Sequence, residues 1–436
     1  MTTSTIPATG SLANSIGRYR WVICTLLFLA TTINYIDRQV LSLIKGTLDA
    51  QLGWTNEQFG LTNAFFQIAY ACSMLGFGWF IDRKGVKIGY AVSIAAWSLA
   101  AAAHALVGSV NGFYAARVAL GLGEGGNFPS SIKAVAQWFP KRERAFATAL
   151  FNSGSNVGAI VAPAIVPVIL GVWGWHAAFL VMGAVGLLWL LLWLPLYDDP
   201  EKSKRLSAAE LVHIRSDSAL EGSGEAKLRW RAILGYRQAW SFVVAKLLTD
   251  PVWWFFLTWL PDLFKKKWGL DIKKSWVHLV TIYAIITVLS IAGGWLTGYL
   301  ARRGWSVTRA RKTGMFIFAC CVLPIVFVTH VSDWGAVMLI GFAGAAHQAW
   351  SANLFTSASD MFPKRALASV IGLGGMAGSM GGILFPIYTG KLLDRFEAAG
   401  NPSAGYGILF GICGLAYLIA FAVNHALAPK FEPIKM

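Results

Sequence analysis

Long apolar segments recur along almost the whole chain, and they constrain the fold more than any other feature of the sequence. A helix of roughly 20 apolar residues spans the hydrocarbon core of a bilayer. Twelve such segments can be marked, at residues 20–44, 57–81, 88–107, 112–138, 145–170, 177–197, 240–264, 277–301, 312–330, 334–359, 367–392 and 404–427. The sequence therefore predicts an all-α integral membrane protein with twelve transmembrane helices in two pseudo-symmetric six-helix halves.

The composition excludes other classes of protein. Hydrophobic residues make up 56% of the chain and charged residues only 13%, whereas soluble domains carry about 25% charged residues. Intrinsic disorder requires low hydrophobicity, so it is excluded as well. The five cysteines lie in apolar segments without zinc-ligand or redox spacing. We expect them to be buried small side chains, and we expect no metal site and no cofactor.

One long polar stretch divides the chain. It predicts a cytoplasmic tail at 1–19, a first half at 20–197, a linker at 198–237, a second half at 238–427 and a tail at 428–436. Most Lys and Arg residues fall in the tails, the linker and the loops on the same side, with an exception at 265–267 and 273–274. Positive loops face the cytoplasm, so both termini are predicted to be cytoplasmic. The net charge of +16 then reflects topology and attraction to anionic lipid, not nucleic-acid binding.

An internal repeat supports the division into halves. Phe139-Pro140-Lys141-Arg142 recurs as Phe362-Pro363-Lys364-Arg365. The same offset, without gaps, maps Gly158 onto Gly381 and Pro163 onto Pro386. Two parallel six-helix halves with a site between them at the middle of the membrane are a transporter architecture.

Four charged residues inside predicted helices are the main functional candidates, because intramembrane charges are expensive to insert. Asp37 and Arg38 are adjacent in the first helix. Arg117 and Glu124, seven residues apart in the fourth helix, share one helix face. The alternative is that they only lock helices together as ion pairs, but apolar residues hold helices without the desolvation penalty.

Chemistry assigns these four residues different roles. An arginine stays charged and matches a carboxylate with two parallel hydrogen bonds, so Arg38 is the first choice for the carboxylate of an anionic substrate. A carboxylate in a partly dry cavity can load and release a proton, which makes Asp37 and Glu124 the expected coupling acids. Arg117 is the expected partner of Glu124. Sodium coupling stays open, since carboxylates serve either ion.

Other polar side chains suit a ligand rich in hydroxyl groups. Asn63, Gln67 and Tyr70 share a face of the second helix within tolerance, and Asn152 and Asn156 form an i,i+4 pair in the fifth. The tenth helix offers His347, Trp350 and Asn353.

Each of these polar residues also has a structural interpretation. Taken singly, each can instead be an interhelical hydrogen-bonding residue, and His347 can be a satisfied interior histidine. Asp82 and Arg83 are expected at the cytoplasmic gate. Lys246 and Asp250, four residues apart in the seventh helix, look like a local ion pair.

Several motifs resemble those of one family. Residues 78–87 (GWFIDRKGVK) resemble the loop signature of the major facilitator superfamily, and Arg117 followed by Gly121 resembles its helix-four motif. Three further segments resemble the anion:cation symporter branch of this superfamily: residues 34–38 (NYIDR), 121–129 (GLGEGGNFP) and 249–261 (TDPVWWFFLTWLP). Residues 347–355 (HQAWSANLF) and 304–312 are similar to bacterial hexuronate transporters within that branch.

The resemblance implies proton-driven uptake of an organic anion by alternating access across a bacterial inner membrane. It implies proton coupling by Asp37 and Glu124, substrate-carboxylate binding by Arg38 and a site-lining role for Tyr70. One departure is Gly298, where the second cytoplasmic loop repeat of the family often has an aspartate.

The sequence therefore predicts a proton-coupled symporter, expected to be monomeric, that imports a hexuronate such as glucuronate or galacturonate. The alternatives are another organic anion, either an aldonate such as galactonate or an aromatic carboxylate, with sodium as a possible coupling ion. Trp253, Trp254, Trp259 and Trp350 keep the aromatic option open. A membrane enzyme is disfavoured because no nucleophile–base pair, metal-ligand cluster or phosphate loop supports one.

Overall fold

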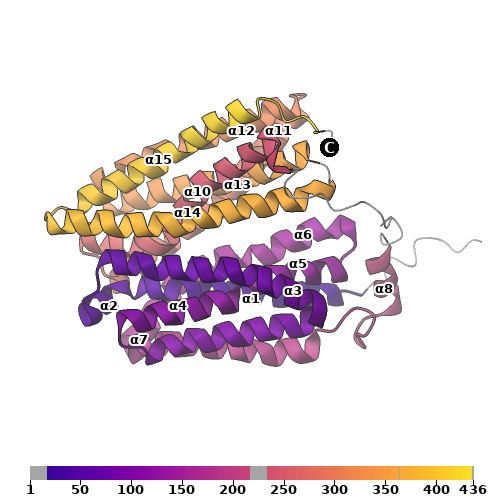
Figure 1. Ribbon diagram of the computed structural model, residues 1–436, viewed down its shortest axis with the longest axis horizontal. Coiled ribbons are helices and arrows are strands. Elements are labelled where there is room, and N and C mark those ends of the chain that lie inside the picture. The colour runs from indigo at the N-terminus through magenta and orange to yellow at the C-terminus, as the bar shows by residue number, and fades with distance from the viewer. Residues whose placement is uncertain (1–16, 217–232, 363, 435–436) are drawn as a thin grey trace, which may run out of the picture.

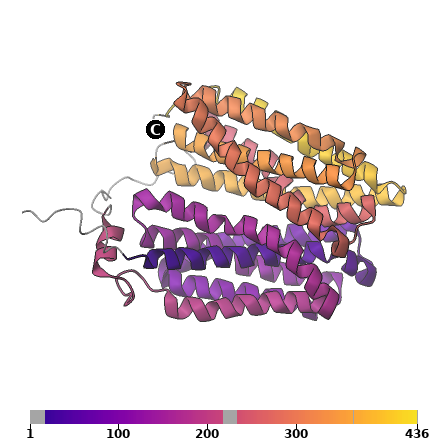
Figure 2. The ribbon, with the colours of Figure 1, turned by 180° about the vertical axis from the view of Figure 1, so that it is seen from behind.

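Two helical bundles pack against each other along their length (Figures 1 and 2). The computed structural model describes residues 17–216, 233–362 and 364–434, and every regular element in these ranges is a helix. The first half of the chain forms one bundle and the second half forms the other. The predicted all-α fold is confirmed.

The first bundle contains long helices that cross it twice. Its elements are α1 (Tyr19–Leu43), α2 (Lys45–Leu52), α3 (Asn56–Ala103), α4 (Val110–Glu124), α5 (Asn127–Trp138), α6 (Lys141–Asn152) and α7 (Gly154–Leu196). α3 and α7 each reverse direction at a glycine with positive φ, Gly85 (81°) and Gly174 (79°), a conformation that glycine adopts without a steric penalty. With α4 and α5 as one crossing, and α6 continuing into α7 as another, this bundle supplies six crossings.

The second bundle supplies six more. Its elements are α10 (Arg237–Trp268), α11 (Ile272–Arg302), α12 (Val307–Val322) with the 3₁₀ helix η4 (Leu323–His330), α13 (Asp333–Met361), α14 (Lys364–Ala398) and α15 (Pro402–Leu427). Within the described residues, nine helical segments are long and apolar enough to span a membrane by length and composition alone. The arrangement is consistent with the twelve predicted crossings.

The fourth predicted span, 112–138, is not one continuous helix. It is divided at Gly125 and Gly126 into α4 and α5, so that Glu124 is the last residue of α4. A Cβ atom at Gly121 would lie 2.5 Å from the backbone oxygen of Phe66, and one at Gly123 would lie 2.5 Å from the backbone nitrogen of Trp97. These glycines let α4 lie directly against α3, which carries Glu124 into the interior of the first bundle.

A polar network joins the linker to the first bundle at the end where α1 begins. The linker contains α8 (Ala208–Arg215). Arg20 donates to Glu143 at 2.9 Å and to Glu210 at 3.0 Å, and the His213 ring is 2.8 Å from Glu143. Partial burial acts to raise the pKa of Glu143, but the hydrogen bonds from Arg20 and His213 outweigh it and hold the pKa below its ordinary value.

The two bundles meet through four pairs of helices in the described part of the chain: α3 with α14, α7 with α11, α1 with α10, and α2 with α10. α1 carries two of the four predicted charged residues, and α10 faces it from the other half. The interface between the bundles is therefore where the candidate site is built.

Candidate functional site

The four intramembrane charges predicted from the sequence lie together. Arg38 Nε donates to Glu124 Oε2 at 2.5 Å, and the two side chains are 7% and 0% exposed. Arg117 Nη2 donates to the backbone oxygen of Arg38 at 3.3 Å, and Asp37 is buried beside them. The ion pair to Glu124 is thus made by Arg38, whereas the sequence had suggested Arg117 as its partner.

Aromatic rings from both bundles surround the Arg38 guanidinium. Its central carbon lies 4.5 Å from the ring centroid of Tyr70 and 5.2 Å from that of Phe66, both on α3. Trp254 of α10 lies 5.7 Å away. Such contacts stabilise a desolvated cation. Because Trp254 belongs to the second bundle, Arg38 lies at the junction of the two halves.

Several buried polar atoms of the charged cluster make no hydrogen bond within the described residues. Both carboxylate oxygens of Asp37, Oε1 of Glu124, Nη2 of Arg38 and Nε of Arg117 are buried and have no hydrogen-bond partner among the described residues. Buried polar atoms are normally hydrogen-bonded, and exceptions concentrate at sites with a chemical role. The cluster therefore has spare capacity for a proton, water or a polar ligand.

A small cavity adjoins the cluster. Its volume is about 30 Å³, and the residues that line it include Arg38, Asn63, Gln67, Arg117, Trp254 and Thr258. A cavity of this size holds one or two water molecules. A sugar acid is larger than this space, so the residues that line it would have to move apart to admit one.

The cavity lining extends the predicted set. Asn63 and Gln67 were expected from the face of the second predicted helix, and they line the cavity as expected. Thr258 was missed, because one threonine in a long apolar helix carries no sequence signal. Trp254 was recognised only as an aromatic residue, and nothing in the sequence placed it beside Arg38.

The candidates from the tenth predicted helix lie elsewhere, inside the second bundle. The Nδ1 atom of His347 is 2.6 Å from the hydroxyl oxygen of Tyr417, and the His347 ring stacks on Trp253 with 5.6 Å between ring centroids. Trp350 is fully buried against Tyr417. Asn353 donates to the backbone oxygen of Ala349 at 2.8 Å. None of the three lines the cavity beside Arg38.

The remaining candidates also lie outside the cluster. Asn152 is the exposed last residue of α6, and Asn156 is half-buried in the first turn of α7. Arg83 is exposed, with its guanidinium over the Trp79 ring. The side chain of Asp82 lies outside the described part of the structure.

The pair predicted in the seventh helix is confirmed. Lys246 Nζ lies 2.7 Å from Asp250 Oδ2.

A comparison with known families identifies the family to which the chain belongs. A family model described as Major Facilitator Superfamily matches residues 27–386. The chain belongs to this superfamily. It is accordingly a multi-pass membrane transporter and not an enzyme.

Among the curated relatives of this superfamily member is the hexuronate transporter of Escherichia coli K12, which is 30% identical and covers 93% of each chain. The D-galactonate transporter of Escherichia coli O6:H1 is 26% identical over 94% of this chain and 95% of its own length. The galacturonate transporter of Dickeya chrysanthemi is 34% identical over 58% of this chain and 74% of its own.

Solved structures show the same major facilitator fold. A bacterial homologue of the human lysosomal transporter Spinster, in an inward-facing and occupied conformation, superposes with a TM-score of 0.75 at 17% identity, covering 94% of this chain and 97% of that one. A D-xylose–proton symporter superposes with a TM-score of 0.72 at 16% identity, covering 96% and 100%.

Proposed function

We propose that this transporter is a proton-coupled symporter that imports a sugar-acid anion, a hexuronate such as glucuronate or galacturonate, by alternating access. The observation that carries the proposal is the buried Arg38–Glu124 ion pair, together with Asp37 beside it, whose carboxylate has no hydrogen-bond partner in the described part of the chain. The relatives named for hexuronate, galacturonate and D-galactonate transport support the substrate class.

The charge balance of the cluster supports coupling of an anion to a proton. Asp37 and Glu124 offset Arg38 and Arg117 when all four are ionised. Each proton taken up by an acid leaves one positive charge without compensation, which is unfavourable in a buried site. One substrate carboxylate restores neutrality. Proton and anion therefore stabilise each other's binding, as symport requires.

The ion pair itself suggests how the two binding events are linked. While Glu124 is ionised, it occupies the Nε side of the Arg38 guanidinium. A protonated Glu124 holds the guanidinium less strongly, because a hydrogen bond to a neutral acid replaces the ion pair between two opposite charges. Arg38 then becomes available to a substrate carboxylate. Release of the proton on the other side of the membrane lets Glu124 pair with Arg38 again and displace the anion.

The hydroxyl-bearing part of the substrate has suitable neighbours in the cavity wall. Asn63, Gln67 and Thr258 supply amide and hydroxyl groups, and Trp254 supplies a flat ring. Amides and hydroxyls distinguish sugar epimers through hydrogen bonds. Asn63 and Gln67 come from the first bundle and Thr258 and Trp254 from the second, so a bound sugar acid would contact both halves.

The sequence supplies the rest of the proposal, which concerns location and assembly. The protein is a monomer in the inner membrane of a bacterium, in contact with lipid, and both of its termini lie in the cytoplasm. Asp82 and Arg83 serve the cytoplasmic gate in this mechanism. Tyr70 and Arg117 belong to the substrate site with Arg38, and Asn152, Asn156, His347, Trp350 and Asn353 would approach the substrate only in an open state.

Counterflow in proteoliposomes tests the substrate class. Vesicles loaded with unlabelled glucuronate are expected to take up labelled glucuronate, and unlabelled galacturonate should compete. Galactonate, glucarate and benzoate form the comparison panel. Stronger competition by galactonate than by galacturonate would shift the assignment to an aldonate. Competition by benzoate alone would favour an aromatic carboxylate, and uptake that requires sodium would change the coupling ion.

A further inference from the structure

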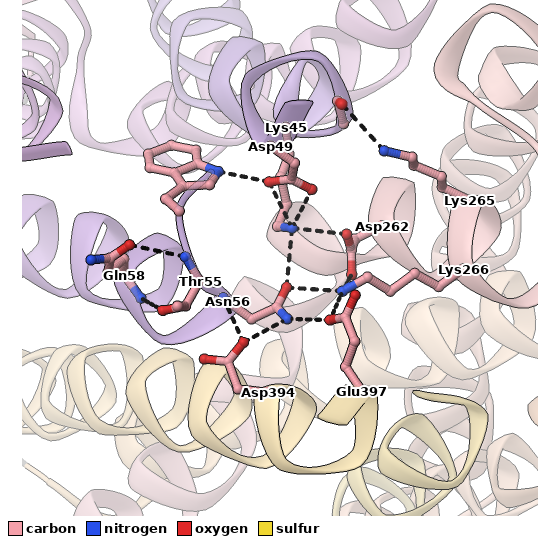
Figure 3. A network of polar contacts seen from close by, with 12 residues as sticks. Lys45, Asp49, Thr55, Asn56, Gln58, Asp262, Lys265, Lys266, Asp394 and Glu397 are labelled. Carbon is pink, nitrogen blue, oxygen red and sulfur yellow. Dashed lines mark hydrogen bonds and ion pairs between the residues drawn. The ribbon is translucent and has the colours of Figure 1, made fainter. Parts of the chain in front are cut away.

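A second polar network joins the two bundles at the end of the molecule away from α8 and the C-terminus (Figures 1 and 3). The first bundle contributes α2 and the start of α3, and the second contributes the last turns of α10 and α14. Lys45, Asp49 and Asn56 face Asp262, Lys266, Asp394 and Glu397 across the interface. None of them is a functional candidate by sequence, although residues 265–267 depart from the charge pattern of the loops.

Lys45 is the cation at the centre of this network. Its Nζ lies 2.8 Å from Asp49 in its own bundle and 2.9 Å from Asp262 in the other. The Lys45 and Asp262 side chains are 3% and 1% exposed. Asp262 has two further partners in its own bundle, the hydroxyl of Tyr406 at 2.6 Å and Lys266 at 3.2 Å.

The N-terminus of α3 is capped from the other bundle. The backbone N–H groups of Asn56 and Glu57 donate to the two carboxylate oxygens of Asp394, both at 2.8 Å. The first N–H groups of a helix have no partner inside the helix, and a carboxylate there is also favoured by the helix dipole. Asp394 of α14 therefore stabilises α3 only while the bundles touch.

Backbone contact accompanies the polar network. A Cβ atom at Gly60 would collide with the backbone oxygen of Pro386, and one at Gly390 would collide with the backbone oxygen of Asn56. α3 and α14 can approach this closely only because both positions are glycine. The same end of the interface is thus closed by charge, by a shared helix cap and by backbone packing.

We infer that Lys45–Asp262 and the Asp394 cap on α3 form a latch that closes this mouth of the transporter and opens by partner exchange. When the bundles part, Lys45 keeps Asp49, and Asp262 keeps Lys266 and Tyr406. Neither charge is left without a partner in its own bundle, which removes much of the penalty for breaking a buried ion pair. The latch rests on alternating access in the proposed function but not on the identity of the substrate.

Spin-label distances across the mouth test the latch without any substrate. The labels are placed at the exposed positions Gln51 and Ala399, each changed to Cys, with Cys72, Cys320 and Cys321 changed to Ser. The ratio of open to closed populations is expected to rise about tenfold or more in Lys45→Gln and in Asp262→Asn, since each removes one partner of a buried charge pair. The double variant should open no further than the more open single variant, because the same pair is lost.

Matched variants separate the latch from general damage. Lys267→Gln removes a neighbouring lysine for which the described structure shows no ion pair, and it should leave the distances unchanged. Gly60→Ala should widen the mouth through backbone contact with every charge retained. Asp394→Ala should widen it through loss of the cap.

Unchanged distances in Lys45→Gln, Asp262→Asn and Gly60→Ala would overturn the inference, and so would equal opening in Lys267→Gln. Opening in the latch variants of a protein that transports no sugar acid would leave the latch standing and reject only the substrate proposal. If the protein takes up a sugar acid but the distances in the latch variants are unchanged, the substrate proposal stands and the latch is rejected.

Discussion

Glu124→Gln is expected to abolish accumulation of the sugar acid against its gradient while leaving exchange of labelled for unlabelled substrate intact. Glutamine imitates the protonated acid in shape and hydrogen bonding but cannot release a proton. It also carries no charge, so it cannot form the ion pair that joins Glu124 to Arg38. Arg38 thus stays available to the substrate carboxylate, and the carrier binds and exchanges its anion without responding to the proton gradient.

The measurement is uptake into proteoliposomes, in one series with an inward proton gradient and in another with internal substrate and no gradient. Glu143→Gln is the matched control, because Glu143 is an ion-paired glutamate of the same bundle that lies outside the cluster. It should retain gradient-driven accumulation. Accumulation in Glu124→Gln at the wild-type level would remove Glu124 from the coupling mechanism and leave Asp37 as the remaining candidate.

Arg38→Lys is expected to weaken substrate binding by about tenfold or more, since it loses one of two hydrogen bonds to the substrate carboxylate, and a hydrogen bond to a charged group contributes roughly 1.5–3 kcal/mol. Lysine keeps the positive charge, but it lacks the planar fork that binds a carboxylate with two hydrogen bonds. The substitution would also remove the contacts that the guanidinium makes with the rings of Tyr70, Phe66 and Trp254. Arg38→Met should bind still less, because the cluster then carries two acids and one arginine.

Binding is measured by scintillation proximity or calorimetry in detergent, which reports affinity separately from transport. Arg309→Lys is the matched control: Arg309 is exposed and its guanidinium lies over the Trp305 ring, so the same substitution should leave affinity unchanged. An Arg38→Lys variant with wild-type affinity would show that the carboxylate binds elsewhere, and Arg117 would be the next residue to test.

The sequence alone predicted the part of the site that carries charge. Charged residues inside apolar segments are rare because they are expensive to insert, so Asp37, Arg38, Arg117 and Glu124 stand out from the residues around them. Their spacing placed Arg117 and Glu124 on one helix face. Which arginine pairs with Glu124 depends on where α1 and α4 lie relative to each other. Glycine contacts place α4 against α3 and α7 against α1, and helical periodicity does not reveal them.

Polar residues without charge were harder to assign. Asn63 and Gln67 reach the cavity, whereas His347 is held by Tyr417 and Trp253 inside the second bundle. Both outcomes fit the same sequence pattern, because a polar residue in a membrane helix serves equally as ligand or as interhelical partner. The latch was missed for a different reason. Lys45, Asp262 and Asp394 lie near helix ends, where charges are common, and only the packing of the two bundles brings them together.

The proposed function requires a proton gradient to drive accumulation of a hexuronate by this chain. Its most direct test is uptake of labelled glucuronate by wild-type proteoliposomes, with an inward proton gradient, with the gradient collapsed by a protonophore, and with an inward sodium gradient in its place. Proton symport predicts accumulation above the external concentration only under the proton gradient, with competition by galacturonate. Uptake that is the same with and without the proton gradient, or that is driven by the sodium gradient instead, would contradict proton symport.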